Sequence, residues 1–255
     1  MRKIFKITNG FTLFELLMVI VVIGILAALL FPVVRSAKDK AKKAACLNNV
    51  RQINLGVRMY SNDSNDASPT LGVALTRTNT ATLYSGYKEI MKNYVGLKGV
   101  SSPRDRLFAC PADRFYPSYA LAGHIAPLRY IRDGLHDQPI FDFSSYVFNG
   151  GDNITRRDGA FTFVRPGLAG GKLSSVVHPS RTLLIAEASA LAPWSWHQPS
   201  SRLIFADAKS MVSFVDGHVS YIKIYWVPTP LTGGGTLFAL AYDPPADYEY
   251  QWSGN

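Results

Sequence analysis

Residues of the kind that build catalytic sites are scarce in this sequence. Charged side chains make up 18% of its 255 residues, and there are only five histidines and two cysteines. It contains no Gly-x-Ser-x-Gly, His-Glu-x-x-His, phosphate-binding loop or Cys-x-x-Cys, and its histidines lack the spacing of a metal site. We therefore expect no enzyme and no cofactor, apart from the calcium considered below.

The positive charge is concentrated rather than spread over a surface. Of the formal net charge of +9, the leader residues Arg2, Lys3 and Lys6 carry three, and residues 35–51 carry six positive charges against Asp39. A nucleic-acid-binding domain usually presents a broad basic patch. We expect no nucleic acid partner and place residues 35–51 near anionic lipid headgroups or acidic neighbours.

Between these two basic clusters lies a long run without charge. Residues 16–34 read LLMVIVVIGILAALLFPVV, long enough to cross the hydrocarbon of a bilayer as a helix. A signal peptide would have a shorter apolar region, and a buried core helix is the other alternative. The stronger basic flank follows the run, so the positive-inside rule alone would place that side in the cytoplasm.

The first seventeen residues, MRKIFKITNG followed by FTLFELL, resemble the type IV prepilin signature. The resemblance implies that a prepilin peptidase cuts after Gly10 on the cytoplasmic side and methylates Phe11. It also implies a single-pass protein of the bacterial inner membrane, with a cytoplasmic N-terminus and a periplasmic or extracellular head. Other pilin or pseudopilin subunits would then be its partners.

The same resemblance gives roles to three residues of the apolar helix. Glu15 becomes the fifth residue after cleavage, where its carboxylate would pair with the Phe11 ammonium of a neighbouring subunit; alternatively it only reaches the headgroups. Gly24 and Pro32 stand where pilin helices commonly carry these residues. Because Pro32 lacks an N–H, we expect a bend or local melting there.

Beyond the membrane the helix is expected to continue and to carry a globular head. Cys46, Val50, Ile53, Val57 and Tyr60 form a stripe at helical spacing, suited to packing on a head or to a coiled-coil seam. We divide the chain into a leader (1–10), a transmembrane helix (11–34), a helix continuation (35–61) and a β-rich head (62–255).

The head reads as an antiparallel sheet packed on the helix, which makes the fold class α+β and pilin-like. Asp216-Gly217 predicts a two-residue hairpin turn between the last two candidate strands. The candidate strands are residues 145–149, 160–164, 182–187, 210–215 and 218–225.

The head also resembles a large prepilin-type family with a C-terminal domain marked by histidine, nine residues and Asp-Gly. Residues 46–53 (CLNNVRQI), residues 110–113 (CPAD) and the motif Asp216, Gly217 and His218 carry this resemblance. The family's histidine is absent, because Ala206 stands ten positions before Asp216 and His197 lies further upstream.

Three binding features are left open by the sequence. Cys46 and Cys110 could form a disulfide outside the cytoplasm or remain separate thiols. Calcium is the one metal considered, because Asp63, Asp66, Asp142, Asp152 and Asp158 offer loop oxygens, although none fits an EF-hand. Aromatic residues at 194–197 and 242–252 could bind glycan or another pilin, or simply pack under loops.

These observations predict a structural subunit of a type II secretion pseudopilus or a type IV pilus-like filament. The alternative is a membrane-anchored extracytoplasmic binding module that never polymerises. Glu15 discriminates between the two, because only assembly would need its carboxylate.

Overall fold

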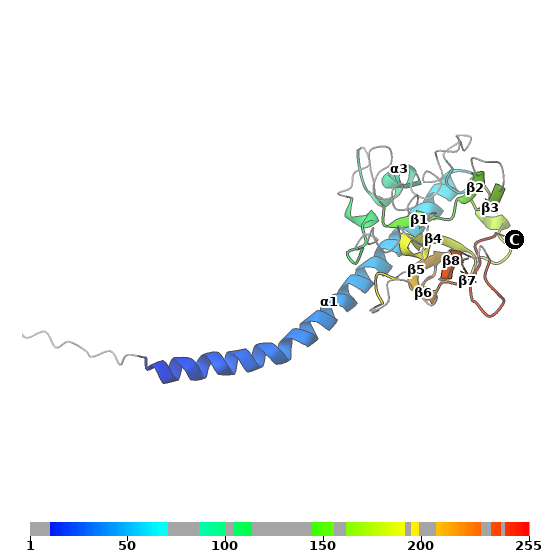
Figure 1. The fold of residues 1–255 in the computed structure, drawn as a ribbon. Helices are drawn as coiled ribbons and strands as arrows, with labels where there is room; N and C mark the ends of the chain where they lie inside the picture. The colour runs from blue at the N-terminus through cyan, green and yellow to red at the C-terminus, as the bar shows by residue number, and fades with distance from the viewer. Residues whose placement is uncertain are drawn as a thin grey trace, which may run out of the picture. The chain divides into compact units, whose positions relative to one another are not determined.

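The computed structural model describes residues 11–70, 87–99, 105–113, 144–155, 162–191, 195–198, 208–230, 236–240 and 243–254. The chain divides into two compact units, Met1–Ala41 and Lys42–Asn255. Helix α1 (Leu13–Asp63) contributes to both, and the second unit contains the sheets. The predicted α+β, pilin-like architecture is thus confirmed (Figure 1).

Within the first unit, α1 is uncharged and apolar on every side from Leu16 to Val34. All residues from Phe11 to Val34 are exposed, with Leu13 at 86% and Phe31 at 73%. Among the described residues, α1 is the one helix long and apolar enough to cross a membrane. It remains helical through Gly24 and Pro32, so of the two alternatives expected at Pro32 local melting is wrong, and a bend stays a prediction. A proline removes a single helical N–H, and α1 continues with that one donor missing.

In the second unit, α1 buries one face. Cys46, Val50, Ile53 and Val57 are fully buried, while Tyr60 is partly buried. The predicted stripe therefore packs within the chain, and the coiled-coil alternative is wrong for these residues. Gly56 lies on the same face, where an added Cβ would come within 2.6 Å of Val95 Cγ1.

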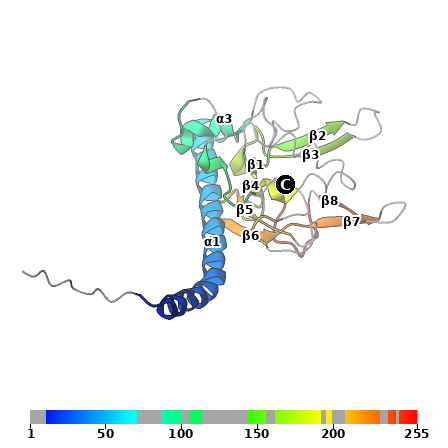
Figure 2. The same cartoon turned by 60° about the vertical axis from the view of Figure 1, so that its left-hand side comes forward.

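The central sheet is four-stranded and antiparallel, in the order β1-β4-β5-β6. Its strands are β1 (Tyr146–Phe148), β4 (Leu183–Glu187), β5 (Lys209–Phe214) and β6 (Val219–Lys223). All residues of β1 and β4 are buried. Figure 2 shows the cyan part of α1 running alongside this sheet, as the apolar stripe requires.

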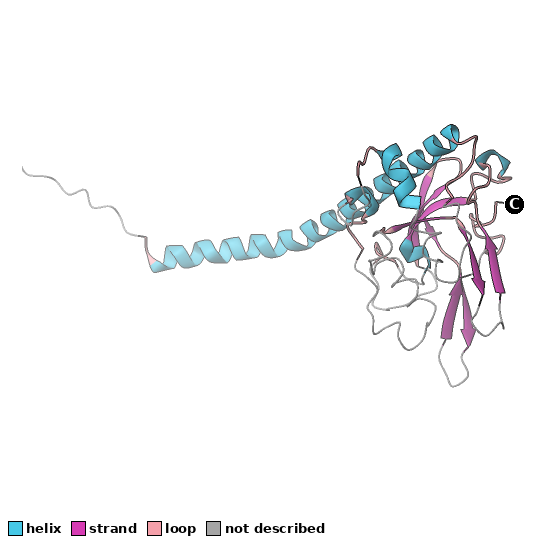
Figure 3. Ribbon diagram, turned by 90° about the horizontal axis from the view of Figure 1, so that it is seen from above, coloured by secondary structure: helices cyan, strands magenta, loops and turns pink. Residues whose placement is uncertain are grey.

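Two further hairpins flank the sheet, formed by β2 (Gly151–Thr155) with β3 (Thr162–Pro166) and by β7 (Trp226–Pro230) with β8 (Thr236–Leu240). Of these strands, only β3 overlaps a predicted one. The short helices are α3 (Tyr87–Met91), η1 (Lys92–Val95), η2 (Arg106–Phe108), η3 (Leu173–Ser175) and η4 (Ala188–Leu191). Seen from above, α3 lies beside the end of α1, away from most of the strands (Figure 3).

The turn between β5 and β6 corrects one prediction. The N–H of Phe214 bonds to the carbonyl of His218 at 3.0 Å, which leaves Val215, Asp216 and Gly217 as a three-residue loop. Gly217 has a φ of 98°, the left-handed residue that such loops need. The two-residue turn predicted from Asp-Gly is therefore wrong by one residue.

Candidate functional site

The start of α1 holds the residues that the sequence linked to processing and assembly. Gly10 lies outside the described residues, and Phe11 is 72% exposed. The N–H and hydroxyl of Thr12 donate to Glu15 Oε2 at 2.9 and 2.7 Å, and the N–H of Glu15 donates back to Thr12 Oγ1 at 3.2 Å. This reciprocal pattern is a capping box, which satisfies amide donors that have no helical partner. Thr12 was not among the predicted site residues.

Further along the apolar helix, Gly24 and Pro32 have no such local contacts to explain them. A Cβ added at Gly24 would meet nothing within 4 Å. The glycine is therefore not needed for packing within the chain, and it costs helix propensity of about 1 kcal/mol relative to alanine.

The Asp216-Gly217-His218 motif lies in the turn that holds the sheet against α1. Arg58 of α1 donates to the carbonyl oxygen of Asp216 at 2.5 Å, and His218 Nδ1 lies 2.6 Å from Asp216 Oδ1. The His218 ring stacks on Phe214, with centroids 4.0 Å apart and planes 9° apart. The motif therefore has a structural role in the described contacts. Its charged side chains are about half exposed, and His218 lines a hollow together with Arg181, Phe214 and Tyr248.

Behind this turn, Asn54 provides a second link between α1 and the sheet. Its side-chain amide, 1% exposed, donates to Ser213 Oγ at 2.9 Å and to the Phe214 carbonyl at 2.8 Å. Asn54 was not among the predicted residues. Its place four residues after Val50 and three before Val57 puts it on the buried face, which is the signal that could have found it.

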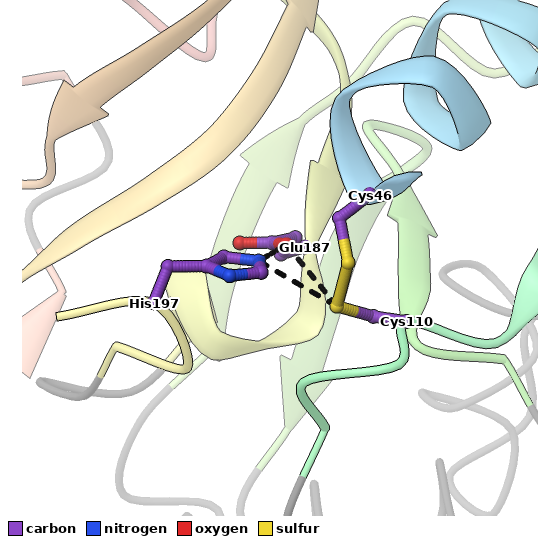
Figure 4. Close-up of side chains that lie close together, drawn as sticks. All are labelled: Cys46, Cys110, Glu187 and His197. Atoms are coloured by element: carbon purple, nitrogen blue, oxygen red, sulfur yellow. Dashed lines mark hydrogen bonds and ion pairs between the residues drawn. A yellow bond between two sulfur atoms is a disulfide. The ribbon is translucent and has the colours of Figure 1, made fainter. Parts of the chain in front are cut away.

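The structure brings together four reactive side chains that the sequence treated separately (Figure 4). Cys46 from α1 and Cys110 from the turn after η2 form a disulfide, with Cα atoms 5.3 Å apart. Glu187 at the end of β4 and His197 complete the group. Its four ligand-type atoms all lie within 4.8 Å of one another.

This cluster is almost entirely shielded from water. Cys46 and Glu187 are fully buried, Cys110 is 4% exposed, and the His197 side chain is 2% exposed. His197 Nε2 lies 2.8 Å from Glu187 Oε1, and Cys110 Sγ lies 3.6 Å from each of these two atoms. The other carboxylate oxygen of Glu187 accepts the N–H of Met211 at 2.9 Å, which fixes the plane of the carboxylate.

Tyr221 and Lys43 form the outer wall of the cluster. The His197 ring meets Tyr221 edge to face, and the Tyr221 hydroxyl lies 3.1 Å from Ser195 Oγ. Lys43 Nζ sits 3.5 Å from the centroid of the Tyr221 ring. Desolvation and nearby Lys209 lower the pKa of Lys43, while the charge of Glu187 acts in the opposite direction. A cation is therefore held at the edge of the buried carboxylate.

The proposed calcium ligands do not gather in the part of the chain that is described. Asp66 uses its carboxylate within the loop, accepting the N–H of Ser174 at 3.0 Å and the hydroxyl of Ser61 at 3.3 Å. These bonds from Ser174 and Ser61 hold its pKa below the usual range. Asp142, Asp158 and the side chain of Asp152 lie outside the described residues.

The aromatic segments are packed inside rather than displayed. Trp196, Tyr250 and Trp252 are 7%, 1% and 3% exposed. For these three residues the suggested glycan-binding or pilin-binding face is therefore wrong, and they pack under loops. Tyr248 is only partly buried, so for this residue the suggestion stays a prediction. Trp194 and Tyr242 lie outside the described residues.

Comparisons with known proteins agree with the N-terminal part of this picture. Residues 6–31 match the family described as the prokaryotic N-terminal methylation motif. Over 56 residues the chain is 41% identical to the type II secretion system core protein G of Pseudomonas aeruginosa. This similarity covers 22% of the chain and 39% of that relative. No solved structure matches. The methylation motif, the similarity to this secretion protein and the long apolar helix together make the N-terminal part of the chain similar to that of prepilins.

Proposed function

We propose that this chain is a structural subunit of a type II secretion pseudopilus or a type IV pilus-like filament. The observation that carries the proposal is the apolar surface of α1. From Phe11 to Val34 every side chain is exposed in the single chain, directly within and after the methylation motif. Such a surface needs lipid before assembly and neighbouring helices after it.

The processing of the subunit, its orientation in the membrane and its assembly follow from the same motif. A prepilin peptidase of the inner membrane cuts after Gly10 and methylates the new terminus at Phe11. The head then lies on the periplasmic or extracellular side, and subunits associate through α1. The similar secretion protein of Pseudomonas aeruginosa supports the pseudopilus form of this proposal.

Intact-mass measurement of the chain, with and without a co-expressed prepilin peptidase, tests the processing. We expect loss of residues 1–10 and gain of one methyl group only when the peptidase is present. Gly10→Val should block the cut, because a branched side chain replaces the hydrogen beside the scissile bond. An uncut wild-type chain in the presence of active peptidase would remove the cleavage assignment.

A second candidate, the non-polymerising membrane anchor, is favoured by the capping box. Glu15 already finds its hydrogen-bond donors in Thr12 of the same chain, so a neighbouring ammonium is not needed to satisfy it. In that reading the head would be an extracytoplasmic binding module. Assembly has to be tested with variants that separate the charge of Glu15 from its capping role.

Glu15→Gln and Thr12→Ala make that separation. Glutamine can still cap a helix from this position but carries no charge, whereas Thr12→Ala removes the hydroxyl and keeps the charge. If the chain is a filament subunit, Glu15→Gln abolishes filaments after normal processing, and Thr12→Ala weakens them less. Asp39→Asn is the matched control, because it neutralises an exposed carboxylate on the same helix. Unchanged complexes in Glu15→Gln would favour the anchor.

A further inference from the structure

The buried cluster of Cys46, Cys110, Glu187 and His197 includes none of residues 11–34, the exposed surface on which the proposed assembly rests. Its carboxylate is fully buried, and a polar group in such a place requires a partner. In the oxidised chain its side-chain partner is His197, whose Nε2 lies 2.8 Å from Glu187 Oε1. The cluster is then a hydrogen-bonded carboxylate and imidazole set against a disulfide.

The spacing of the cluster suits a shared cation. Cys110 Sγ lies 3.6 Å from both Glu187 Oε1 and His197 Nε2, an ordinary van der Waals separation for a disulfide sulfur. The edges of a tetrahedral zinc site, whose bonds are about 2.0–2.3 Å, are about 3.3–3.8 Å long, so these three atoms already lie at the spacing of ligands to one ion.

We propose that, when the disulfide is reduced, Cys46, Cys110, His197 and Glu187 form a site for one Zn²⁺ ion. Two thiolates, one imidazole nitrogen and one carboxylate oxygen are a tetrahedral zinc donor set. Thiolate ligands disfavour Ca²⁺ and Mg²⁺, so this is a different site from the oxygen-only calcium site considered from the sequence.

The surroundings provide the outer support that zinc sites use. The N–H of Met211 holds the second oxygen of Glu187 at 2.9 Å, which orients the first oxygen toward the sulfur atoms. Two thiolates, one carboxylate and a divalent cation leave a net charge of −1, with the imidazole neutral. Lys43, held above the Tyr221 ring, supplies the compensating positive charge at the outer wall.

The redox step balances with a dithiol as reductant. The dithiol gives two electrons and two protons to the Cys46–Cys110 bond and becomes a disulfide itself, leaving two thiols in the chain. Each thiol loses its proton when it binds the metal, so loading releases protons to solvent. A second disulfide reverses the step by thiol–disulfide exchange: it takes up the two electrons and becomes a dithiol, while the Cys46–Cys110 bond forms again and the ion is released.

The test uses the full-length chain in detergent and Co²⁺ as a spectroscopic substitute for Zn²⁺. One sample is left oxidised, and the other is reduced anaerobically with a water-soluble phosphine, which is itself oxidised to phosphine oxide. We expect one Co²⁺ per reduced chain, with thiolate-to-cobalt charge-transfer bands and the visible bands of tetrahedral cobalt. The oxidised chain should show neither.

Two variants separate this site from a simple pair of thiols. His197→Ala keeps both cysteines and should weaken cobalt binding about tenfold or more, because one of four ligands is lost. His178→Ala is the matched control, since this histidine is exposed and belongs to the same head. The proposal is overturned if the reduced wild type shows no thiolate-to-cobalt band, or if His197→Ala binds as tightly as the wild type.

Reduction could also unfold the head, and the test remains decisive in that case. Zn²⁺ should then restore the near-ultraviolet circular dichroism of the reduced wild type but not of reduced His197→Ala. Failure of Zn²⁺ to restore it in the wild type would overturn the proposal. None of these outcomes depends on leader cleavage or filament formation.

Discussion

The buried amide of Asn54 allows a quantitative test of how α1 is fastened to the head. Asn54→Ala removes two hydrogen bonds, to Ser213 Oγ at 2.9 Å and to the Phe214 carbonyl at 2.8 Å. The Phe214 carbonyl keeps a hydrogen-bond donor, because the N–H of Gly217 still donates to it at 3.0 Å. The buried hydroxyl of Ser213 does lose the amide that donates to it, so the cost combines one ordinary hydrogen bond with a less satisfied buried hydroxyl, about 2 kcal/mol in all.

For a domain of this size, about 2 kcal/mol corresponds to a fall in Tm of about 4–8 °C. The measurement is thermal unfolding of the full-length chain in detergent, followed by tryptophan fluorescence. Asn48→Ala is the matched control, because Asn48 is exposed on the same helix. Equal Tm values for the two variants would refute the view that Asn54 fastens α1 to β5.

Three further substitutions or conditions test the packing of the head. Asp105→Asn should lower the free energy of unfolding by about 3 kcal/mol, measured by urea denaturation, because its carboxylate lies 3.3 and 3.2 Å from the buried ammonium groups of Lys88 and Lys92. Gly217→Ala should cost about 1–2 kcal/mol in the same assay, since its φ of 98° disfavours any Cβ. Burial raises the pKa of Tyr146 well above the usual 10.0, so stability should be constant below about pH 10 and fall by about 1.4 kcal/mol per pH unit above it.

The sign of the tyrosine effect follows from linkage. The unfolded chain loses the phenolic proton near pH 10, while the folded chain keeps it, so rising pH favours unfolding. Tyr87 and Tyr250 add to the effect because burial raises the pKa of each. Urea unfolding of the wild type from pH 8 to pH 11 measures it, and a free energy that stays flat to pH 11 would contradict it.

Controls for the other two substitutions come from the same chain. Asp247→Asn neutralises an exposed carboxylate of the head and should leave the free energy of unfolding within about 0.5 kcal/mol of wild type. Gly99→Ala also introduces a Cβ at positive φ, but nothing lies within 4 Å of it. It should share the conformational cost of Gly217→Ala without the clash at Arg58 Nη1, which the added Cβ would approach to 2.7 Å.

Helices and strands could be predicted from the sequence where the pattern that marks them lies within one short segment. The uncharged run from Leu16 to Val34 is long enough to span a bilayer, and the stripe from Cys46 to Val57 follows helical spacing, so both segments of α1 were predictable. Strand β4 was predictable for the same reason, since LLIAE is a short apolar run next to turn residues. Strands β2 and β7 carry glycine, proline and polar residues that are typical of loops. Strand β8, TLFAL, is a short apolar run that was missed although its composition suits a strand.

The buried cluster was not predictable, because its members come from four separate segments. His197 stands nineteen positions before Asp216, too far to fit the spacing of the family motif. Glu187 was placed within a predicted strand, but a carboxylate at the end of an apolar strand has no visible partner in the sequence. Tertiary packing alone brings the imidazole, the carboxylate and the sulfur atoms within reach.

The position of Cys46 explains why a covalent link at this point matters for the head. Among the buried residues of α1, Cys46 comes first, and Val50, Ile53 and Val57 follow it at helical spacing. The link to Cys110 closes a loop across 64 positions, which in the chain-entropy model stabilises the folded head by about 4 kcal/mol. Without the disulfide, the turn of α1 at Cys46 would separate from the head most easily. It is the first buried turn, so it has a buried neighbouring turn on one side only. A pull transmitted along α1 would meet this turn before any other buried residue, so the disulfide, or a metal ion in its place, secures the head where separation would begin.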